Sequence, residues 1–593
     1  MSAGDLGDVM QPNRVWQNRG SSRMIPLIVI AASICLAGHT LPAFADDTRP
    51  RVVASFDEMP KVVTLPAGRL MAFFHSVRTD LTEMREAAAR ISDDGGRTWG
   101  DLKTLFPLPV DQGGFGYTLP FSDPSGEQHL FLLCDANTGQ VRPLKGPRPP
   151  NLGPYGKLDI WHARTTNGGR TWLPPRRIWE GRAGDMQSVI QLKSGRILLP
   201  ISYWVPRTWA NRGEGFEAFT FLGSFRSSAI YSDDGGATWR RSPAELKVPT
   251  PAIGDLGAVE PVVIQLKDGR VWMLIRTQVG RFYESFSADG VAWTPPVPSK
   301  IESSDSPSCL IRLTDGRILL LVNHFQRWPY ANGGRQVLHA AVSRDEGRTW
   351  QGWREVIRDP LRNEPPPPNG DHGVSYPYPT LTRDGKVVFS MWVQTGPRRF
   401  LVQLDPKWLD ETRQAADFAN RMDEWSIFGT KGVEFRSHPA APGKKVLLVS
   451  KTQVDWPAGA AWNFPRGSSG HLRMRLRLMP GHGDFLIGLT DHFSAPFDDQ
   501  DELYNLYNLR INADGNGSVG AALKGDRWHV LEFRWNARRQ ECRVFLDGSA
   551  AGVIPQTRIS PGVNYVRIRS LALGRGDAGL LVESAEADVI QLD

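Results

Sequence analysis

The chain has 593 residues, a formal net charge of +7, and 40% hydrophobic and 22% charged residues. This ordinary globular composition excludes intrinsic disorder, and the length allows two to four domains. Positive and negative charges are interspersed rather than gathered in basic runs, which argues against a nucleic-acid-binding protein.

The N-terminus has the pattern of a secretory signal peptide over residues 1–45. Three arginines precede the short apolar run MIPLIVIAASICLAG, and the small residues of AFA (43–45) follow it. This order predicts cleavage after Ala45 and a secreted or periplasmic mature protein. No later stretch reaches the roughly 20 apolar residues of a membrane-spanning helix, so no transmembrane segment is predicted for the mature protein.

Six apolar segments, each interrupted by a glycine-containing turn, follow between residues 50 and 405. Apolar runs on both sides of such a turn predict a β-hairpin. The turn glycines are Gly68, Gly126, Gly195, Gly269, Gly316 and Gly385. A long period built from strands predicts a propeller or a solenoid.

A second repeat alternates with the first five hairpins. Its copies are ISDDGGRTW (91–99), TTNGGRTW (165–172), YSDDGGATW (231–239), FSADGVAW (286–293) and VSRDEGRTW (342–350). We expect the Asp to bind backbone N–H groups of a turn, the Gly to adopt positive φ, and the Trp to pack between neighbouring units. The role of these boxes is therefore predicted to be structural. A hairpin and two further strands make a four-stranded blade, so residues 50–405 are predicted to form six blades.

The remaining chain is predicted to hold a connector and a second domain. PKWLDETRQAADFANRMDEW (406–425) indicates a short helical connector, placed at 406–428. From 430 to 593, alternating segments such as HLRMRLRLM and ECRVFLDG predict an antiparallel β-sandwich. The predicted fold class is therefore all-β, a six-bladed propeller followed by a sandwich.

The hairpins and boxes together resemble the sialidase (neuraminidase) superfamily, whose six-bladed propellers carry such Asp boxes. The resemblance covers about 350 residues and is more specific for fold than for function, because Asp boxes also occur in propellers that hydrolyse nothing. The later region resembles sandwiches of the concanavalin or laminin-G kind, which either bind sugar or pack against a catalytic domain. Both roles stay open.

The segment GAVEPVVIQLKDGRVWMLIRTQVGR (257–281) carries two charged residues within apolar strands, Glu260 and Arg276. A charge in such a position needs a partner or a ligand, so one alternative is an internal ion pair. The resemblance implies more: a Glu that withdraws the proton of a nucleophile, and an Arg that grips the substrate carboxylate bidentately. It also implies a second such arginine, for which Arg335 fits and Arg327 is the weaker rival.

The resemblance further implies a tyrosine nucleophile early in the sixth blade and an aspartic acid after the first hairpin. NGDHGVSYPYPTL (369–381) offers Tyr376 and Tyr378, and Tyr376 is the candidate, with a packed wall residue as the alternative. Asp80 is the candidate acid, with Glu83 and Glu86 nearby. The family's first arginine, before a proline at the start of blade one, is absent here.

At that place the chain has DEMPK, with Lys61 after the proline. Lysine can hold a carboxylate as a point charge but not bidentately, which indicates a substrate other than ordinary sialic acid, or no hydrolysis.

Three functions are therefore open. The first is a secreted glycoside hydrolase acting on an anionic sugar. The second is a lyase on a uronate-containing glycan, in which histidines such as His372, His75 or His162 would work with a tyrosine. The third is a propeller that binds acidic glycans without catalysis. No zinc-like Cys/His spacing or calcium-loop motif is present, so no metal or cofactor is predicted. The predicted substrate-binding residues are Arg276, Arg335 and His372.

Overall fold

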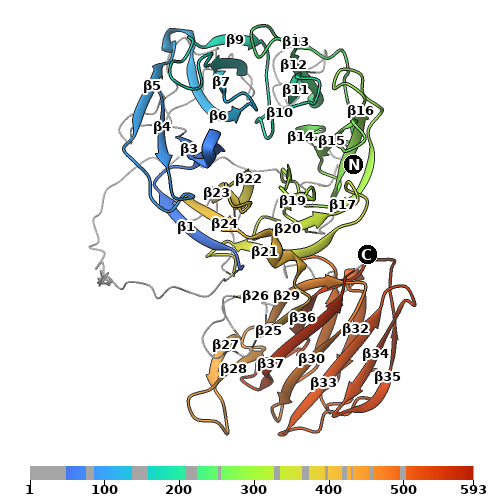
Figure 1. Ribbon diagram of the computed structural model, residues 1–593. Helices are drawn as coiled ribbons and strands as arrows, with labels where there is room; N and C mark the ends of the chain where they lie inside the picture. The colour runs from blue at the N-terminus through green and yellow to red at the C-terminus, as the bar shows by residue number, and fades with distance from the viewer. Residues whose placement is uncertain are drawn as a thin grey trace, which may run out of the picture. The chain divides into compact units, whose positions relative to one another are not determined.

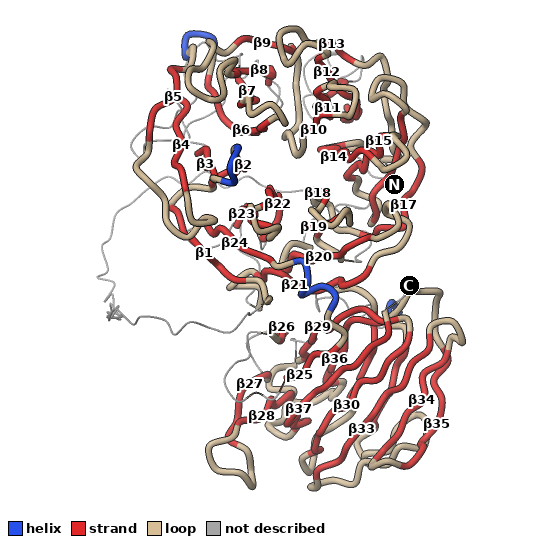
Figure 2. Tube along the Cα trace, viewed as in Figure 1, coloured by secondary structure: helices blue, strands red, loops and turns tan. Residues whose placement is uncertain are grey.

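The structure is a computed structural model that describes residues 48–591, apart from a set of internal segments. These segments are 75–85, 136–157, 207–222, 251–255, 326–333, 364–372, 394–398, 417, 419–423, 429–431, 455–457 and 494–502. The regular structure of the described residues is β-strand with a few short 3-10 turns, so the predicted all-β class is confirmed (Figure 2). No helix in this part of the chain is long and apolar enough to span a membrane.

Six antiparallel four-stranded sheets form the blades of a propeller (Figure 1). Blade one contains β2 (Pro60–Thr64), β3 (Leu70–Phe74), β4 (Glu86–Ser92) and β5 (Lys103–Pro107), and blade two contains β6 (Gly114–Ser122), β7 (Gln128–Asp135), β8 (Leu158–Arg164) and β9 (Arg176–Trp179). Blade three contains β10 (Ile190–Gln191), β11 (Ile197–Pro206), β12 (Gly223–Ser232) and β13 (Arg240–Arg241), and blade four contains β14 (Val259–Gln265), β15 (Val271–Arg276), β16 (Arg281–Ser287) and β17 (Val297–Glu302).

Blade five contains β18 (Cys309–Arg312), β19 (Ile318–Val322), β20 (Val337–Ser343) and β21 (Gln351–Arg358). Blade six contains β22 (Val374–Leu381), β23 (Val387–Val393), β24 (Arg399–Leu404) and β1 (Arg51–Phe56). The first strand of the chain thus pairs with β24 and supplies the outer strand of the last blade. This pairing closes the ring between the two ends of the propeller sequence. Two 3-10 turns, η1 (Pro66–Gly68) and η2 (Val110–Gln112), connect strands near the start.

All six predicted hairpins are present, each between the first and second strand of a blade. The six turn glycines have φ between 78° and 93°, the left-handed region that glycine enters without steric cost. Since the turn chemistry is local, the sequence pattern located these turns correctly.

The box residues have the structural role that was predicted. Asp94 accepts hydrogen bonds from the amides of Arg97 and Thr98 at 3.0 and 2.9 Å. The Trp99 ring packs edge-to-face on Phe56 of blade six, with ring centroids 5.8 Å apart. Other box tryptophans likewise contact the preceding blade; the pairs are Trp172–Phe73, Trp239–Phe131 and Trp350–Trp272.

The C-terminal region is a two-sheet β-sandwich. One sheet has the order β27-β28-β37-β30-β33-β34-β35, with β25 on β37, and the other has the order β26-β29-β36-β31-β32. The strands are β25 (Arg413–Ala416), β26 (Trp425–Phe428), β27 (Val433–Ser437), β28 (Lys445–Ser450), β29 (Gly459–Gly467), β30 (Ser469–Leu478), β31 (Phe485–Thr490), β32 (Tyr507–Ile511), β33 (Trp528–Asn536), β34 (Glu541–Leu546), β35 (Ser549–Pro555), β36 (Val563–Ser570) and β37 (Gly579–Ile590). Their inward side chains form one apolar core that includes Trp462, Phe485 and Phe533.

Over the described residues 406–416, the helical connector expected at 406–425 is wrong. The segment begins with a single 3-10 turn, η5 (Pro406–Asp410), capped by the Asp405 side chain on the amide of Lys407 at 3.0 Å. It then continues as β25, which pairs with β37. The free edge of β37 offers backbone hydrogen bonds, and this tertiary pairing outweighs the weak local helix propensity.

Candidate active site at the mouth of the propeller

The innermost strands of the six blades surround a central cavity of about 370 Å³. Its lining includes Lys61 of β2, Tyr378 of β22 and Gln187, which precedes β10. Charged side chains gather where these strands begin.

Tyr376, Glu260 and Arg276 lie in mutual hydrogen-bonding contact. The Tyr376 hydroxyl donates to Glu260 Oε1 at 3.2 Å, and Arg276 Nη1 donates to the Tyr376 oxygen at 3.1 Å. Tyr376 comes from blade six and the other two come from blade four, so the closed ring brings them together. The structure thus brings three of the predicted site residues into direct contact.

The backbone is irregular at Glu260 and Tyr376, the two residues joined by the hydrogen bond of the phenol. Glu260 has φ 46° and Tyr376 has φ 57°, and each lies within a register shift of its hairpin. A non-glycine residue at positive φ is strained, and such strain persists where the surrounding structure enforces it. These two bulges direct the Glu260 and Tyr376 side chains towards each other.

Arg276 forms a buried ion pair on each side of its guanidinium. It lies 2.5 Å from Glu260 and 2.7 Å from Asp305, with side chains that are only 4–9% exposed. Burial alone would lower the pKa of Arg276, but the charges of Glu260 and Asp305 raise it well above its ordinary value. Burial would raise the pKa of Asp305, but Arg276 holds it below its ordinary value. The internal Glu–Arg ion pair is therefore real, and Tyr376 shares both of its members.

The phenol of Tyr376 is kept in its protonated form. Burial and the negative charge of Glu260 raise the pKa of Tyr376 above its ordinary value, against the opposing effect of Arg276. A phenolate at this position therefore needs proton transfer to a base during the reaction, and Glu260 is the base within reach.

Arg335 lies over the ring of Tyr376, two residues before β20 begins. Its Nη2 donates to the backbone oxygen of Asp305 at 2.9 Å, and its Cζ lies 5.4 Å from the centre of the Tyr376 ring. Among the described residues, the buried Nε of Arg335 has no hydrogen-bond partner. The guanidinium therefore keeps donor capacity that an anionic ligand can use.

Lys61, which follows Pro60 at the start of blade one, stacks on Tyr378. Its amine lies 3.9 Å from the centre of that ring, a cation–π contact. Burial lowers the pKa of Lys61 to about 7, partly opposed by the charge of Asp185. Near neutral pH this lysine is therefore a weaker fixed cation than an arginine would be.

Asp185 belongs to the same charge cluster and was missed by sequence reasoning. Burial and the charge of Glu260 raise the pKa of Asp185 to about 6, opposed by Lys61 and Arg276. It precedes the inner strand of blade three at nearly the place that Glu260 has in blade four. This positional match between blades is the signal that could have identified Asp185.

We expect the Asp185→Asn substitution to change how stability depends on pH. The folded state binds a proton at Asp185 more tightly than the unfolded chain does, so the contribution of Asp185 to stability falls as pH rises from about 4 to about 6. We expect Asp185 to lower the free energy of unfolding by about 1–2 kcal/mol across this range, a loss that the Asp185→Asn variant lacks. Urea unfolding at both ends of this range measures it. Equal slopes for the two proteins would show that Asp185 does not titrate as described.

Two predicted residues, Asp80 and His372, lie outside the described residues, as do Arg327 and His75. His162, considered for a lyase, lies inside blade two and not in this site. It is buried, stacks on His129 and lies 3.0 Å from it. Burial holds the pKa of His162 well below its ordinary value, so it is a core residue.

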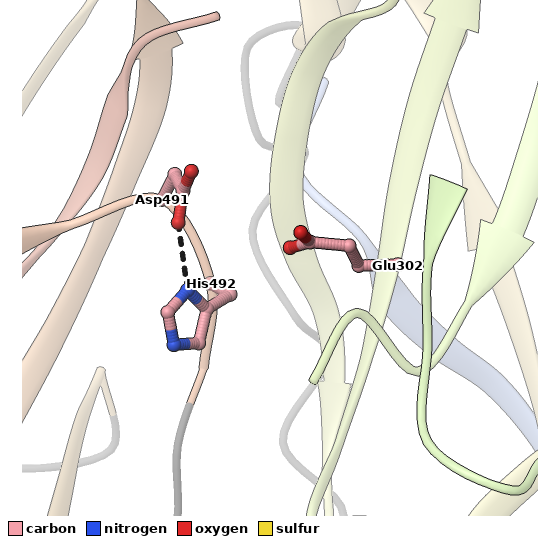
Figure 3. Close-up of side chains that lie close together, drawn as sticks. All are labelled: Glu302, Asp491 and His492. Atoms are coloured by element: carbon pink, nitrogen blue, oxygen red, sulfur yellow. Dashed lines mark hydrogen bonds and ion pairs between the residues drawn. The ribbon is translucent and has the colours of Figure 1, made fainter. Parts of the chain in front are cut away.

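Outside this site, Glu302, Asp491 and His492 form a cluster of potential metal ligands (Figure 3). Its donor atoms lie within 4.8 Å of one another. However, the Asp491 carboxylate already accepts bonds from Arg558 at 3.0 Å and from Ser560 at 2.6 Å. A divalent cation would have to displace an arginine, so this is an ionic cluster between blade four and the sandwich.

Comparison with known proteins agrees with the predicted family. Residues 68–389 match the family described as "BNR repeat-like domain". This match covers more than half of the chain, so the protein belongs to this family. The resemblance to the sialidase superfamily is confirmed at this level.

Two curated relatives are sialidases. The chain is 26% identical over 332 residues to a sialidase of Micromonospora viridifaciens, covering 49% of this chain and 45% of that one. It is 27% identical over 236 residues to a sialidase of Paraclostridium sordellii, covering 36% and 53%. The chain thus spans about half the length of the curated relatives it matches.

Among solved structures, the chain is similar to Trypanosoma rangeli sialidase in complex with the inhibitor DANA. The identity is 12%, the TM-score is 0.41, and the match covers 90% of this chain and 92% of that one.

Proposed function

We propose that this protein is an exported glycoside hydrolase of the sialidase type that acts on an anionic sugar. The observation that carries the proposal is the position of the Tyr376 hydroxyl between Glu260 Oε1 and Arg276 Nη1, at 3.2 and 3.1 Å. A candidate nucleophile, its base and a cation meet there. Export is proposed from the signal sequence of residues 1–45.

In the proposed reaction Tyr376 Oη bonds to the anomeric carbon while its proton passes to Glu260. The glycosidic C–O bond breaks, and the leaving oxygen takes a proton, for which Asp80 is the candidate donor. The hydroxyl of a water molecule then bonds to the anomeric carbon while the water proton passes to the candidate acid Asp80. The tyrosyl–sugar bond breaks, and Glu260 returns the proton to Tyr376. A neutral phenol suits this step, because a carboxylate nucleophile would be repelled by an anionic group beside the anomeric carbon.

Arg276 and Arg335 are the proposed contacts for the anionic group of the sugar. They flank Tyr376, and Arg335 has an unengaged buried Nε. Guanidinium groups bind carboxylates with strong, directional hydrogen bonds.

Arg335→Ala is expected to raise KM roughly 10- to 100-fold, since hydrogen bonds to charged groups contribute about 1.5–3 kcal/mol. We expect a smaller effect on kcat, because Arg335 does not contact the Tyr376 hydroxyl. Steady-state kinetics on an aryl glycoside of the anionic sugar measures both constants. A fall in kcat with unchanged KM would rule out substrate binding as its main role.

Lys61 favours a second candidate, a propeller that binds acidic glycans without turnover. A lysine cannot reproduce the bidentate contact of an arginine, and the lowered pKa of Lys61 weakens its charge further. The same lysine also fits a substrate whose acid group is placed differently from that of sialic acid.

The experiment that tests the proposal is a panel of aryl glycosides of sialic and uronic acids. Release of the aryl alcohol together with the free sugar supports hydrolysis. An ultraviolet-absorbing unsaturated product from a polymeric uronate would instead indicate a lyase. Binding of an acidic glycan without any product would indicate the non-catalytic propeller.

A further inference from the structure

The propeller and the sandwich share a buried apolar cluster next to the candidate site. Blade five contributes Phe325 and Val337, and the sandwich contributes Ala461, Phe493 and Tyr565. Phe325 and Phe493 form a parallel backbone bridge, in which the Phe493 amide donates to His324 O at 3.3 Å. Their ring centroids are 5.8 Å apart.

The ring of Phe325 in turn contacts the backbone of Gly334. A Cβ at Gly334 would lie 2.7 Å from Cδ1 of Phe325 and 2.5 Å from Cβ of Ser304, so only glycine fits between them. The Ser304 hydroxyl also donates to Gly334 O at 3.0 Å. Gly334 is therefore fixed on both sides, and it immediately precedes Arg335.

Arg335 is tied to the site through its backbone as well as its side chain. Its carbonyl oxygen accepts the amide of Val374 at 2.9 Å, on the strand that carries Tyr376. Its guanidinium reaches Asp305 O at 2.9 Å. A shift of Phe325 would therefore move Gly334 and change both contacts of Arg335.

Independent polar contacts hold the sandwich on the outer strands of blade five. The Tyr565 hydroxyl lies 2.6 Å from both His339 and Glu355. Asn564 donates to the carbonyl oxygen of Trp353 at 2.9 Å. Tyr565 packs edge-to-face on Phe493, with ring centroids 6.1 Å apart. The hydrogen bond of Asn564 to Trp353 is made by neither Phe493 nor Phe325, so Asn564 provides the matched control.

We propose that Phe493 of the sandwich is a positioning residue for Arg335, acting through Phe325 and Gly334. The sandwich is then a structural part of the anion-binding site. This inference rests on the proposed function for the role of Arg335 in binding, although the positioning itself does not depend on that role.

The test compares Phe493→Ala with Asn564→Ala in the full chain by hydrogen exchange. The Val374 amide is the reporter, because its hydrogen bond ends on Arg335 O. We expect exchange at Val374 to become at least about tenfold faster in Phe493→Ala and to stay near the wild-type rate in Asn564→Ala. Phe493→Leu keeps most of the apolar volume, so we expect a smaller increase in the exchange rate of Val374. It replaces Phe493→Ala in this test if the alanine variant does not fold. Unchanged Val374 exchange in a folded Phe493 variant would overturn the proposal.

A second measurement links the positioning to binding. We expect Phe493→Ala to weaken binding of the anionic sugar by roughly tenfold or more, and to add little in a chain that already carries Arg335→Ala. Fully additive losses in the double variant would overturn the proposal. If wild type binds no anionic sugar, the proposed function fails, whereas the exchange experiment still decides the positioning.

Discussion

Replacing Tyr376 with phenylalanine is expected to lower kcat/KM by about 10³-fold or more, because the nucleophilic oxygen is lost. Sugar affinity should change little, since the ring and both flanking arginines remain. Comparing turnover of an aryl glycoside with equilibrium binding of the free sugar separates these two effects.

Tyr378 provides a matched control on the same strand. The ring of Tyr378 stacks on the amine of Lys61. The hydrogen bond to Glu260 is made by Tyr376. Tyr378→Phe keeps the stacked ring, so we expect a loss of less than about tenfold. The reverse order, with the larger loss at Tyr378, would show that the nucleophile has been assigned to the wrong tyrosine.

Replacing Arg276 with alanine is expected to affect both folding and catalysis. The substitution leaves Glu260 and Asp305 as buried carboxylates without their main counter-charge. Removing one partner of a buried ion pair costs about 3–5 kcal/mol of stability. Denaturant unfolding near neutral pH measures this loss, and activity should fall below detection because Arg276 also contacts the Tyr376 oxygen.

Arg276→Lys separates the charge from the geometry. A lysine keeps a positive charge between the two carboxylates but cannot donate to Glu260, Asp305 and Tyr376 in the fixed arrangement of a guanidinium. We expect it to recover most of the stability and little of the activity. An alanine variant as stable as wild type would contradict the counter-charge role.

The periodic parts of the fold were predictable from the sequence because their causes are local. A turn glycine such as Gly269 needs positive φ, and a box residue such as Asp94 binds amides a few residues away. The connector was not predictable, since β25 forms only because β37 offers it an edge.

The candidate site was partly predictable for a related reason. Glu260 and Arg276 lie on the two strands of one hairpin, beside the Val259–Arg276 pair, so their proximity follows from local strand pairing. Their contact with Tyr376 needs the ring to close, and only the family resemblance suggested it. Asp305 reaches the site from the irregular segment between β17 and β18, and no local pattern identifies it. Asp185 was missed although its position before the inner strand of blade three nearly matches that of Glu260 in blade four.

The measurement that tests the central claim most directly is mass spectrometry of the trapped enzyme. A fluorinated analogue of the anionic sugar that the substrate panel identifies would slow release of a covalent intermediate. The account predicts one sugar adduct on the peptide that contains Tyr376, located on that side chain and absent from Tyr376→Phe. An adduct on Tyr378 or on a carboxylate, in an enzyme that turns over the parent sugar, would contradict it.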